Sequence, residues 1–323
     1  AYYLGAIRID NGGMGIGSMN AFVTYLTQIL MSVMMSSMMM NMVPRAMTSI
    51  GRINEVLDYD PTVKDLEPDE EQHLGAFHGL EFRDVSFCYP EADRPVLEHV
   101  SFVTRPGETT AIIGSTGSGK STLINLLPRI YDATQGQVLM NGIDIRQLSQ
   151  AELRSHLGVV PQKALLFDGT IASNLQYGKE DATEEEMWHA LEVAQGKDFV
   201  SQMPAGLEAS ISQGGTNVSG GQRQRLAIAR AIIRRPDVYI FDDSFSALDF
   251  KTDAKLRQAL SHETKNAAVL IVAQRVTTVL NADRIVVLDE GKVAGIGTHK
   301  ELMESCQVYK EIVLSQLSAE EVA

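Results

Sequence analysis

The residues most able to do chemistry lie in the stretch 114 to 121, which reads GSTGSGKS. It fits the pattern G-x-x-x-x-G-K-[ST] at every fixed position, and it follows the apolar segment TTAIIG, which is typical of a short buried strand. Backbone N–H groups of such a loop and of the helix after it surround phosphate oxygens, and the glycines allow close approach. The pattern therefore predicts a nucleoside triphosphate site in which Lys120 meets the β- and γ-phosphates and Ser121 ligates Mg²⁺.

Two adjacent carboxylates, Asp242 and Asp243, end the apolar run RPDVYIFDD. A strand that ends beside the phosphate loop would place Asp242 where it can hold the magnesium shell. These two features alone would also suit a kinase or a GTPase. The discriminating stretch is NVSGGQRQRLAIARAI, residues 217 to 232, in which two glycines precede a helix that is basic on one side and apolar on the other. The start of that helix offers backbone donors to a phosphate, and in a dimer it could reach a nucleotide held by another subunit.

These motifs, together with VVPQ ending at Gln162 and SALD at 246 to 249, resemble the nucleotide-binding domain of an ABC transporter. The resemblance covers residues 80 to 318, and the stretch from YLTQIL to RINEVLD is similar to the last transmembrane helix of an ABC exporter half-transporter. It implies an α/β P-loop ATPase domain with an antiparallel β subdomain and a helical subdomain, preceded by an all-α transmembrane segment. The implied cofactors are ATP and Mg²⁺.

The resemblance also implies roles for individual residues. The nucleotide contacts would be Tyr89, stacked on adenine, and Gly114, Ser115, Thr116, Gly117, Ser118, Gly119, Lys120, Ser121 and Thr122. The magnesium ligands would be Ser121, Gln162 and Asp242. Gln162 would also sense the attacking water, and it would lie near the contact with the membrane domain. The signature residues Val218, Ser219, Gly220, Gly221 and Gln222 would serve the nucleotide of a partner subunit, and Ser246, Ala247, Leu248 and Asp249 would lie at the dimer interface.

Two of the predicted catalytic residues, Asp243 and Gln274, depart from the family pattern, whereas the third, Gln162, matches it. The family normally has glutamate after the first aspartate, and Asp243 is one methylene, about 1.5 Å, shorter; a displacement of about 1 Å can cost roughly a hundredfold in rate. Gln274 in LIVAQR stands where a histidine usually contacts the γ-phosphate, and glutamine cannot be protonated near neutral pH. Two such changes resemble the degenerate site of heterodimeric bacterial ABC exporters. They favour a heterodimer, the alternative being a homodimer in which aspartate works slowly.

The first part of the chain predicts a membrane helix, because residues 11 to 44 contain no charged side chain. Residues 19 to 43 would form a helix of about 37 Å, enough to cross a bilayer. Met31, Met35, Met38 and Met42 fall on one stripe, which favours adaptable packing against lipid and neighbouring helices or, alternatively, a wall for varied apolar substrates. Arg45 and Arg52 follow this span and favour a cytoplasmic ATPase domain.

The composition limits the possible partners and the domain plan. The chain of 323 residues has a net charge of −13, with 28 Lys+Arg and 41 Asp+Glu, which disfavours nucleic acid as a partner. We expect a transmembrane part at 1–60, a linker at 61–79, the nucleotide-binding domain at 80–318 and a tail at 319–323. The resemblance further implies a multi-pass protein of a bacterial cell membrane that exports a hydrophobic small molecule, such as a drug in a multidrug exporter, or a lipid or peptide, together with a second half-transporter.

A soluble ABC-type ATPase of DNA maintenance is the alternative from another class. Such proteins place a long coiled coil between the phosphate loop and the signature motif. Here the interval from Gln162 to Ser219 has no sustained heptad pattern, and a candidate membrane span precedes the domain. The sequence therefore favours the exporter over this alternative.

Overall fold

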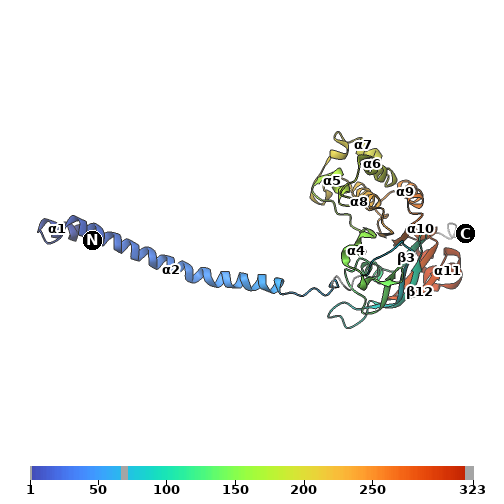
Figure 1. Ribbon diagram of the computed structural model, residues 1–323, viewed down its shortest axis with the longest axis horizontal. Coiled ribbons are helices and arrows are strands. Elements are labelled where there is room, and N and C mark those ends of the chain that lie inside the picture. Colours follow the sequence, from blue (N-terminus) through green and yellow to red (C-terminus); the bar gives the residue numbers. More distant parts are fainter. Residues whose placement is uncertain (1, 67–71, 317–323) are drawn as a thin grey trace. The chain divides into compact units, whose positions relative to one another are not determined.

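The computed structural model describes residues 2–66 and 72–316 and divides the chain into two compact units (Figure 1). The first unit is Ala1–Thr62 and the second is Val63–Ala323.

The first unit consists of helices α1 (Tyr2–Asp10) and α2 (Ile16–Leu57). The apolar span that we predicted at 19–43 lies within α2, which continues past it at both ends and passes through Pro44. Helix α2 is long and apolar enough to cross a membrane by length and composition. Several of its hydroxyl groups bond within the helix: Thr24, Thr27 and Ser32 each donate to the carbonyl four residues earlier, at 2.8 to 2.9 Å. Such bonds remove the need for water, which suits a hydrocarbon environment.

The second unit is built on a six-stranded sheet with the order β12-β11-β3-β10-β9-β6. The strands are β3 (Thr109–Gly114), β6 (Leu157–Val160), β9 (Val238–Asp242), β10 (Ala268–Val272), β11 (Arg284–Asp289) and β12 (Lys292–Gly297). All neighbours pair in parallel except β11 and β12. Strands buried on both faces should be continuously apolar, and β10 is buried at all five positions, as AVLIV predicts.

A second, antiparallel sheet has the order β2-β1-β4-β5. Its strands are β1 (Leu80–Phe87), β2 (Leu97–Thr104), β4 (Gln135–Met140) and β5 (Ile143–Asp144). Side chains alternate between the faces of a strand, and this divides the core in two. Ile112 of β3 packs with residues of the antiparallel sheet, whereas its neighbours Ala111 and Ile113 pack in the cluster that includes the helical region.

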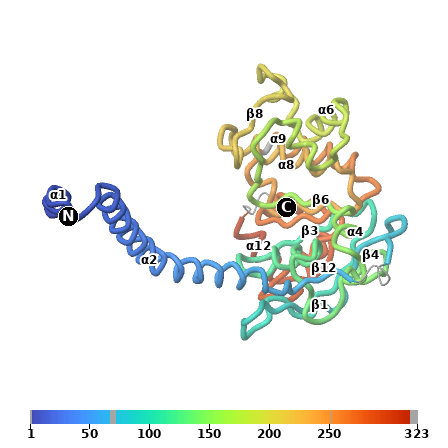
Figure 2. Tube along the Cα trace, turned by 60° about the vertical axis from the view of Figure 1, so that its left-hand side comes forward, coloured from blue at the N-terminus to red at the C-terminus, as the bar shows by residue number. Residues whose placement is uncertain are grey.

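The helical region lies to one side of the central sheet, as both views show (Figures 1 and 2). Its main elements are α5 (Ile171–Gln176), α6 (Glu184–Val193), α7 (Lys197–Ser201) and α8 (Gly220–Arg234), with the short pair β7 (Gly169–Thr170) and β8 (Ser210–Ile211) and the turns η2 (Gly206–Glu208) and η3 (Gln213–Gly215). The remaining helices are α3 (Lys120–Asn125), η1 (Ile145–Gln147), α4 (Gln150–Ser155), α9 (Phe250–Glu263), α10 (Val276–Val279), α11 (His299–Ser305) and α12 (Gln307–Gln316). The parallel sheet, antiparallel sheet and helical region confirm the predicted fold class.

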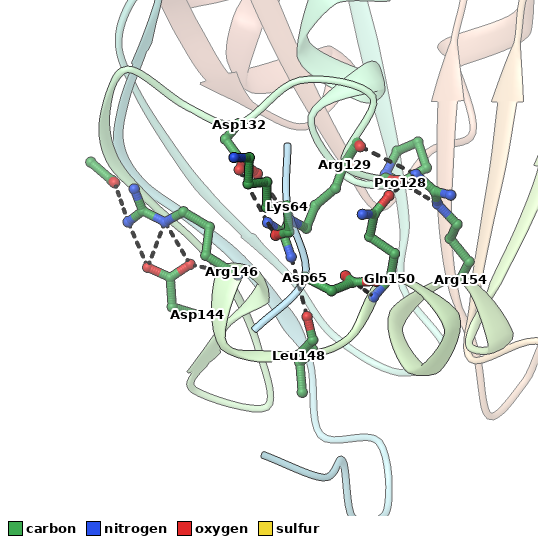
Figure 3. Close-up of polar contacts among 11 residues, drawn as sticks. Lys64, Asp65, Pro128, Arg129, Asp132, Asp144, Arg146, Leu148, Gln150 and Arg154 are labelled. Carbon is green, nitrogen blue, oxygen red and sulfur yellow. Dashed lines mark hydrogen bonds and ion pairs between the residues drawn. The ribbon is translucent and has the colours of Figure 1, made fainter. Parts of the chain in front are cut away.

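The segment that we expected to be a linker is partly held on the second unit (Figure 3). The guanidinium group of Arg129, which is only 3% exposed, donates to the carbonyl of Lys64 at 3.1 Å and to that of Leu148 at 3.2 Å. The same group forms two bonds with the carboxylate of Asp132. Asp65 accepts a bond from the backbone N–H of Gln150 at 2.8 Å. A buried arginine that follows the helix of the phosphate loop thus holds residue 64, and the backbone of Gln150 holds residue 65.

Replacing Arg129 by alanine tests this docking. The substitution leaves Asp132 and two carbonyl groups without their donor, so we expect a loss of about 3 kcal/mol in the free energy of unfolding. Urea denaturation measures it, and hydrogen exchange of residues 63–66 reports whether the segment detaches. The control is Arg83→Ala, which removes an exposed pair with Glu81 and should change little. An unchanged urea midpoint for Arg129→Ala would show that the buried group is dispensable.

Candidate functional site

The register of the parallel strands brings four predicted segments to one edge of the sheet. Val272 at the end of β10 pairs with Ile112 on one side and with Asp242 on the other. Val160 at the end of β6 pairs with Phe241. Since parallel strands leave the sheet at the same edge, the phosphate loop, Gln162, the two aspartates and Gln274 all follow strands at that edge.

These segments line a cavity of about 400 Å³. The lining residues are Val96, Thr116, Gly117, Gly119, Lys120, Ser121, Thr122, Gln162, Asp242, Asp243, Val272 and Gln274. All predicted catalytic and magnesium-binding residues are among them. Sequence reasoning missed Val96 and Val272, because two valines carry no motif and reach the cavity only through strand packing.

The phosphate loop has a backbone that only glycine accommodates well. Gly117 and Gly119 have φ values of +85° and +98°, in the left-handed region. At Gly114, a Cβ atom would lie 2.1 Å from the carbonyl oxygen of Leu288 on the neighbouring strand. The Nζ atom of Lys120 donates to the carbonyls of Gly114 and Ser115 at 2.9 and 2.7 Å. The loop is thus wound around the ammonium group of Lys120.

The charges of the cavity are partly buried, and burial perturbs them in opposite directions. Burial lowers the pKa of the Lys120 ammonium group, although the carboxylates of Asp242 and Asp243 oppose this effect. Burial raises the pKa of Asp242; the charge of Asp243 adds to the rise, whereas a hydrogen bond from Ser121 and the charge of Lys120 oppose it. A cation bound here would favour the ionised form of Asp242.

The donor set around Asp242 fits a magnesium ion. Ser121, Gln162 and Asp242 offer a hydroxyl, an amide oxygen and a carboxylate, which are the hard oxygen ligands that Mg²⁺ prefers. Within the described residues there is no group of three or more His, Cys, Asp or Glu side chains arranged to hold a metal by themselves.

Asp243 contacts Gln162, the predicted sensor of the attacking water. The amide Nε2 of Gln162 donates to the Oδ2 of Asp243 at 3.2 Å. The backbone of Asp243 has a φ of +45° and its N–H donates to the carbonyl of Val272 at 2.9 Å. Aspartate and asparagine are enriched in this left-handed region. The backbone conformation therefore favours a short polar side chain at position 243, independently of any role in catalysis.

Tyr89 lies beside the phosphate loop rather than among the residues that line the cavity. Its hydroxyl is 3.0 Å from the hydroxyl of Thr122, and its ring packs edge-on against Phe87 and Tyr131. The ring is only partly buried. Its predicted stacking on adenine stays a prediction, and Thr122 has a second role as a partner of Tyr89.

The signature residues stand apart from the cavity. Ser219 caps α8: its hydroxyl accepts the N–H of Gln222, and the side chain of Gln222 accepts the N–H of Ser219. No residue of 218–222 is among the described residues that line the cavity. In SALD, Asp249 caps α9 through two bonds from Thr252, which lower the pKa of its carboxyl. Within one chain, the signature residues thus lie outside the cavity that the phosphate loop lines.

Comparisons with known proteins agree with these motifs. The model of the family described as "ABC transporter" matches residues 97–246. An uncharacterized ABC transporter ATP-binding protein of Mycobacterium tuberculosis is 47% identical over 317 residues, which are 97% of this chain and 54% of that protein. The ATP-dependent lipid A-core flippase of Chromobacterium violaceum is 36% identical over 318 residues, 98% of this chain and 54% of that protein.

Among solved structures, a bacterial Atm1-family ABC exporter with ATP bound matches with a TM-score of 0.82 at 31% identity, covering 95% of this chain and 53% of that one. The chain spans about half the length of these relatives. The second unit has an ABC ATPase fold. This fold carries the phosphate loop, the signature helix and the carboxylate at the end of β9, and an apolar helix precedes it in the sequence. Residues 97–246 carry the domain of the ABC transporter family, and nearly the whole chain is similar to exporter-type ABC proteins over about half of their length.

Replacing Asp242 by asparagine separates stability from nucleotide binding. Because burial raises the pKa of Asp242, ionising it disfavours the folded state as the pH rises from the ordinary carboxyl pKa through the raised value. We expect Asp242→Asn to be more stable than the unaltered protein near neutral pH, with the difference shrinking in acid, and to lose Mg²⁺-dependent ATP binding. Denaturant unfolding between about pH 4 and pH 8 measures the first effect. The exposed Asp181→Asn is the control, and a variant less stable at neutral pH would contradict the argument.

Proposed function

We propose that this chain is the ATP-binding part, with its adjoining membrane helix, of an ABC exporter half-transporter. ATP with Mg²⁺ would bind in the cavity at the edge of the parallel sheet. Lys120 would neutralise phosphate charge, the loop N–H groups would donate to phosphate oxygens, and Ser121, Gln162 and Asp242 would hold the ion. The meeting of these groups with Asp243 and Gln274 in one cavity is the observation that carries the proposal.

The same site would be completed by a second ABC subunit. The signature residues are absent from the described lining of the cavity, and Ser219 and Gly220 are exposed at the start of α8. The exposed start of a helix suits the γ-phosphate of a nucleotide bound by another chain. ATP binding would then draw two subunits together, and hydrolysis would release them.

The membrane helix supports transport over a soluble role. We infer that α2 crosses a bacterial cell membrane and that the ATPase domain lies in the cytoplasm, with Arg45 and Arg52 on that side. The exposed methionines of α2 suit lipid, neighbouring helices or a hydrophobic or amphipathic substrate. Just beyond Gln162, the exposed Leu165, Phe167 and Tyr177 suit docking of membrane-domain helices. These features favour an exporter over an ABC-type ATPase of DNA maintenance.

We further propose that the chain's own site hydrolyses ATP slowly and that its partner is a different half-transporter. The carboxylate of Asp243 is engaged by Gln162 and is one methylene shorter than the glutamate it replaces. Gln274 also lines the cavity, and its side-chain amide cannot be protonated near neutral pH. A homodimer with two slow sites is the alternative. The left-handed backbone of Asp243 supports it, because this conformation favours aspartate whether or not the site is degenerate.

Restoring both family residues tests the slow site. We expect Asp243→Glu with Gln274→His to raise ATP turnover of the purified chain roughly ten- to hundredfold, because the longer carboxylate reaches the water and the imidazole contacts the γ-phosphate. Single-turnover hydrolysis and retention of radiolabelled ATP measure it.

The controls separate binding from chemistry. Lys120→Ala should abolish retention of ATP, whereas Asp243→Asn keeps the backbone preference and removes the charge. If the unaltered chain turns over briskly and the double substitution adds nothing, the slow site is refuted and a self-sufficient homodimer is favoured.

A further inference from the structure

One side chain at the end of α12, that of Gln316, reaches the loop that carries Gln274. Its Nε2 donates to the carbonyl of Gln274 at 2.8 Å. Its Oε1 accepts the backbone N–H of Val276 at 2.9 Å. A glutamine amide has both a donor and an acceptor, so one side chain bonds the backbone on both sides of Arg275.

The second of these bonds supplies a cap that the local sequence lacks. Helix α10 begins at Val276, and the N-cap residue Arg275 makes no side-chain capping bond. The first N–H groups of a helix have no partner within the helix. Gln316 provides the acceptor for Val276 from forty residues further along the chain. The start of α10 is thus set by α12.

Helix α12 is itself firmly anchored. Tyr309 and Val313 are fully buried, each 0% exposed, and Ile312 packs against the same core cluster. The hydroxyl of Tyr309 is 2.9 Å from the Nδ1 of His299 on α11. Gln316 therefore extends from a helix with a fixed position, and its two bonds can transmit that position to the loop.

The rest of the loop is tied to the nucleotide-binding elements. The N–H of Ala273 donates to the carbonyl of Ile112 in β3 at 3.0 Å. The guanidinium of Arg275 donates to the carbonyl of Ser246 at 3.3 Å. Gln274 lies between these two attachments, and its carbonyl is the atom that Gln316 holds. The direction of the Cα–Cβ bond follows from the orientation of the backbone, so this bond limits where the Gln274 side chain can point in the cavity.

We propose that Gln316 is a positioning residue that holds Gln274 toward the γ-phosphate of bound ATP. The inference rests on the proposed function of the cavity and on the contact proposed for Gln274. It predicts that the C-terminal helix contributes to the discrimination between ATP and ADP, because only ATP has the phosphate that Gln274 would contact.

The experiment uses the whole chain in detergent and three substitutions in α12, together with Gln274→Ala. Gln316→Ala removes both bonds. Gln316→Glu can still accept from Val276 but cannot donate to Gln274. Gln307→Ala is the matched control, because it removes a glutamine of the same helix whose side chain bonds Glu311 within that helix. Hydrogen exchange of the Val276 amide reports the hold on the loop, and the ratio of the Kd values for ADP and ATP, each with Mg²⁺, reports the consequence.

For exchange at Val276, we expect Gln316→Ala to be roughly three- to tenfold faster, the range that one hydrogen bond supports, and Gln316→Glu to stay near the unaltered rate. We expect the preference for ATP over ADP to fall several-fold in both variants and to stay unchanged in Gln307→Ala. In a chain that already carries Gln274→Ala, Gln316→Ala should have no further effect on this preference.

Two results separate failure of this inference from failure of the proposed function. If Gln274→Ala lowers the preference for ATP and Gln316→Ala does not, Gln316 does not position Gln274 and the inference is overturned. If Gln274→Ala leaves the preference unchanged, the proposed contact of Gln274 fails, and exchange at Val276 alone decides whether Gln316 holds the loop.

Discussion

The parallel register of β3, β10, β9 and β6 is the constraint on which the rest of the site depends. Val272 pairs with both Ile112 and Asp242, so the phosphate loop and the aspartates are separated by the width of one strand. A slip of one residue would turn the apolar set of a strand to the opposite face, and the two core clusters resist it because they fill both faces of the sheet. The packing of the core therefore determines which side chains meet at the edge of the sheet that lines the cavity.

The charged groups of the site lower the stability of the folded protein. Lys120 is buried and Asp242 is partly buried, and burial disfavours the charged form of each. The loop compensates by turning the carbonyls of Gly114 and Ser115 toward the ammonium group. Such an arrangement is held by the surrounding sheet and is better suited to receiving phosphate and a cation than to stabilising the protein by itself.

The two departures from the family pattern stand at the ends of neighbouring strands. Asp243 follows β9 and Gln274 follows β10, and both line one cavity. Each is supported by contacts from elsewhere: Asp243 by the N–H bond to Val272 and by Gln162, and the backbone of Gln274 by Gln316. A change at either position thus acts within a network, which is why their joint replacement is more informative than single substitutions.

The sequence by itself determined the fold class, the nucleotide-binding motifs and the apolar helix, because each of these is local. A phosphate loop needs glycines at set spacings, a buried strand needs a run such as AVLIV, and a bilayer needs a long segment without charge. Only the tertiary structure decided which distant residues meet. Val96 reaches the cavity, Arg129 holds residue 64, and Gln316 caps α10, and these contacts join parts of the chain with no shared motif. Strand pairing and helix packing bring such residues together, and no local spacing records them.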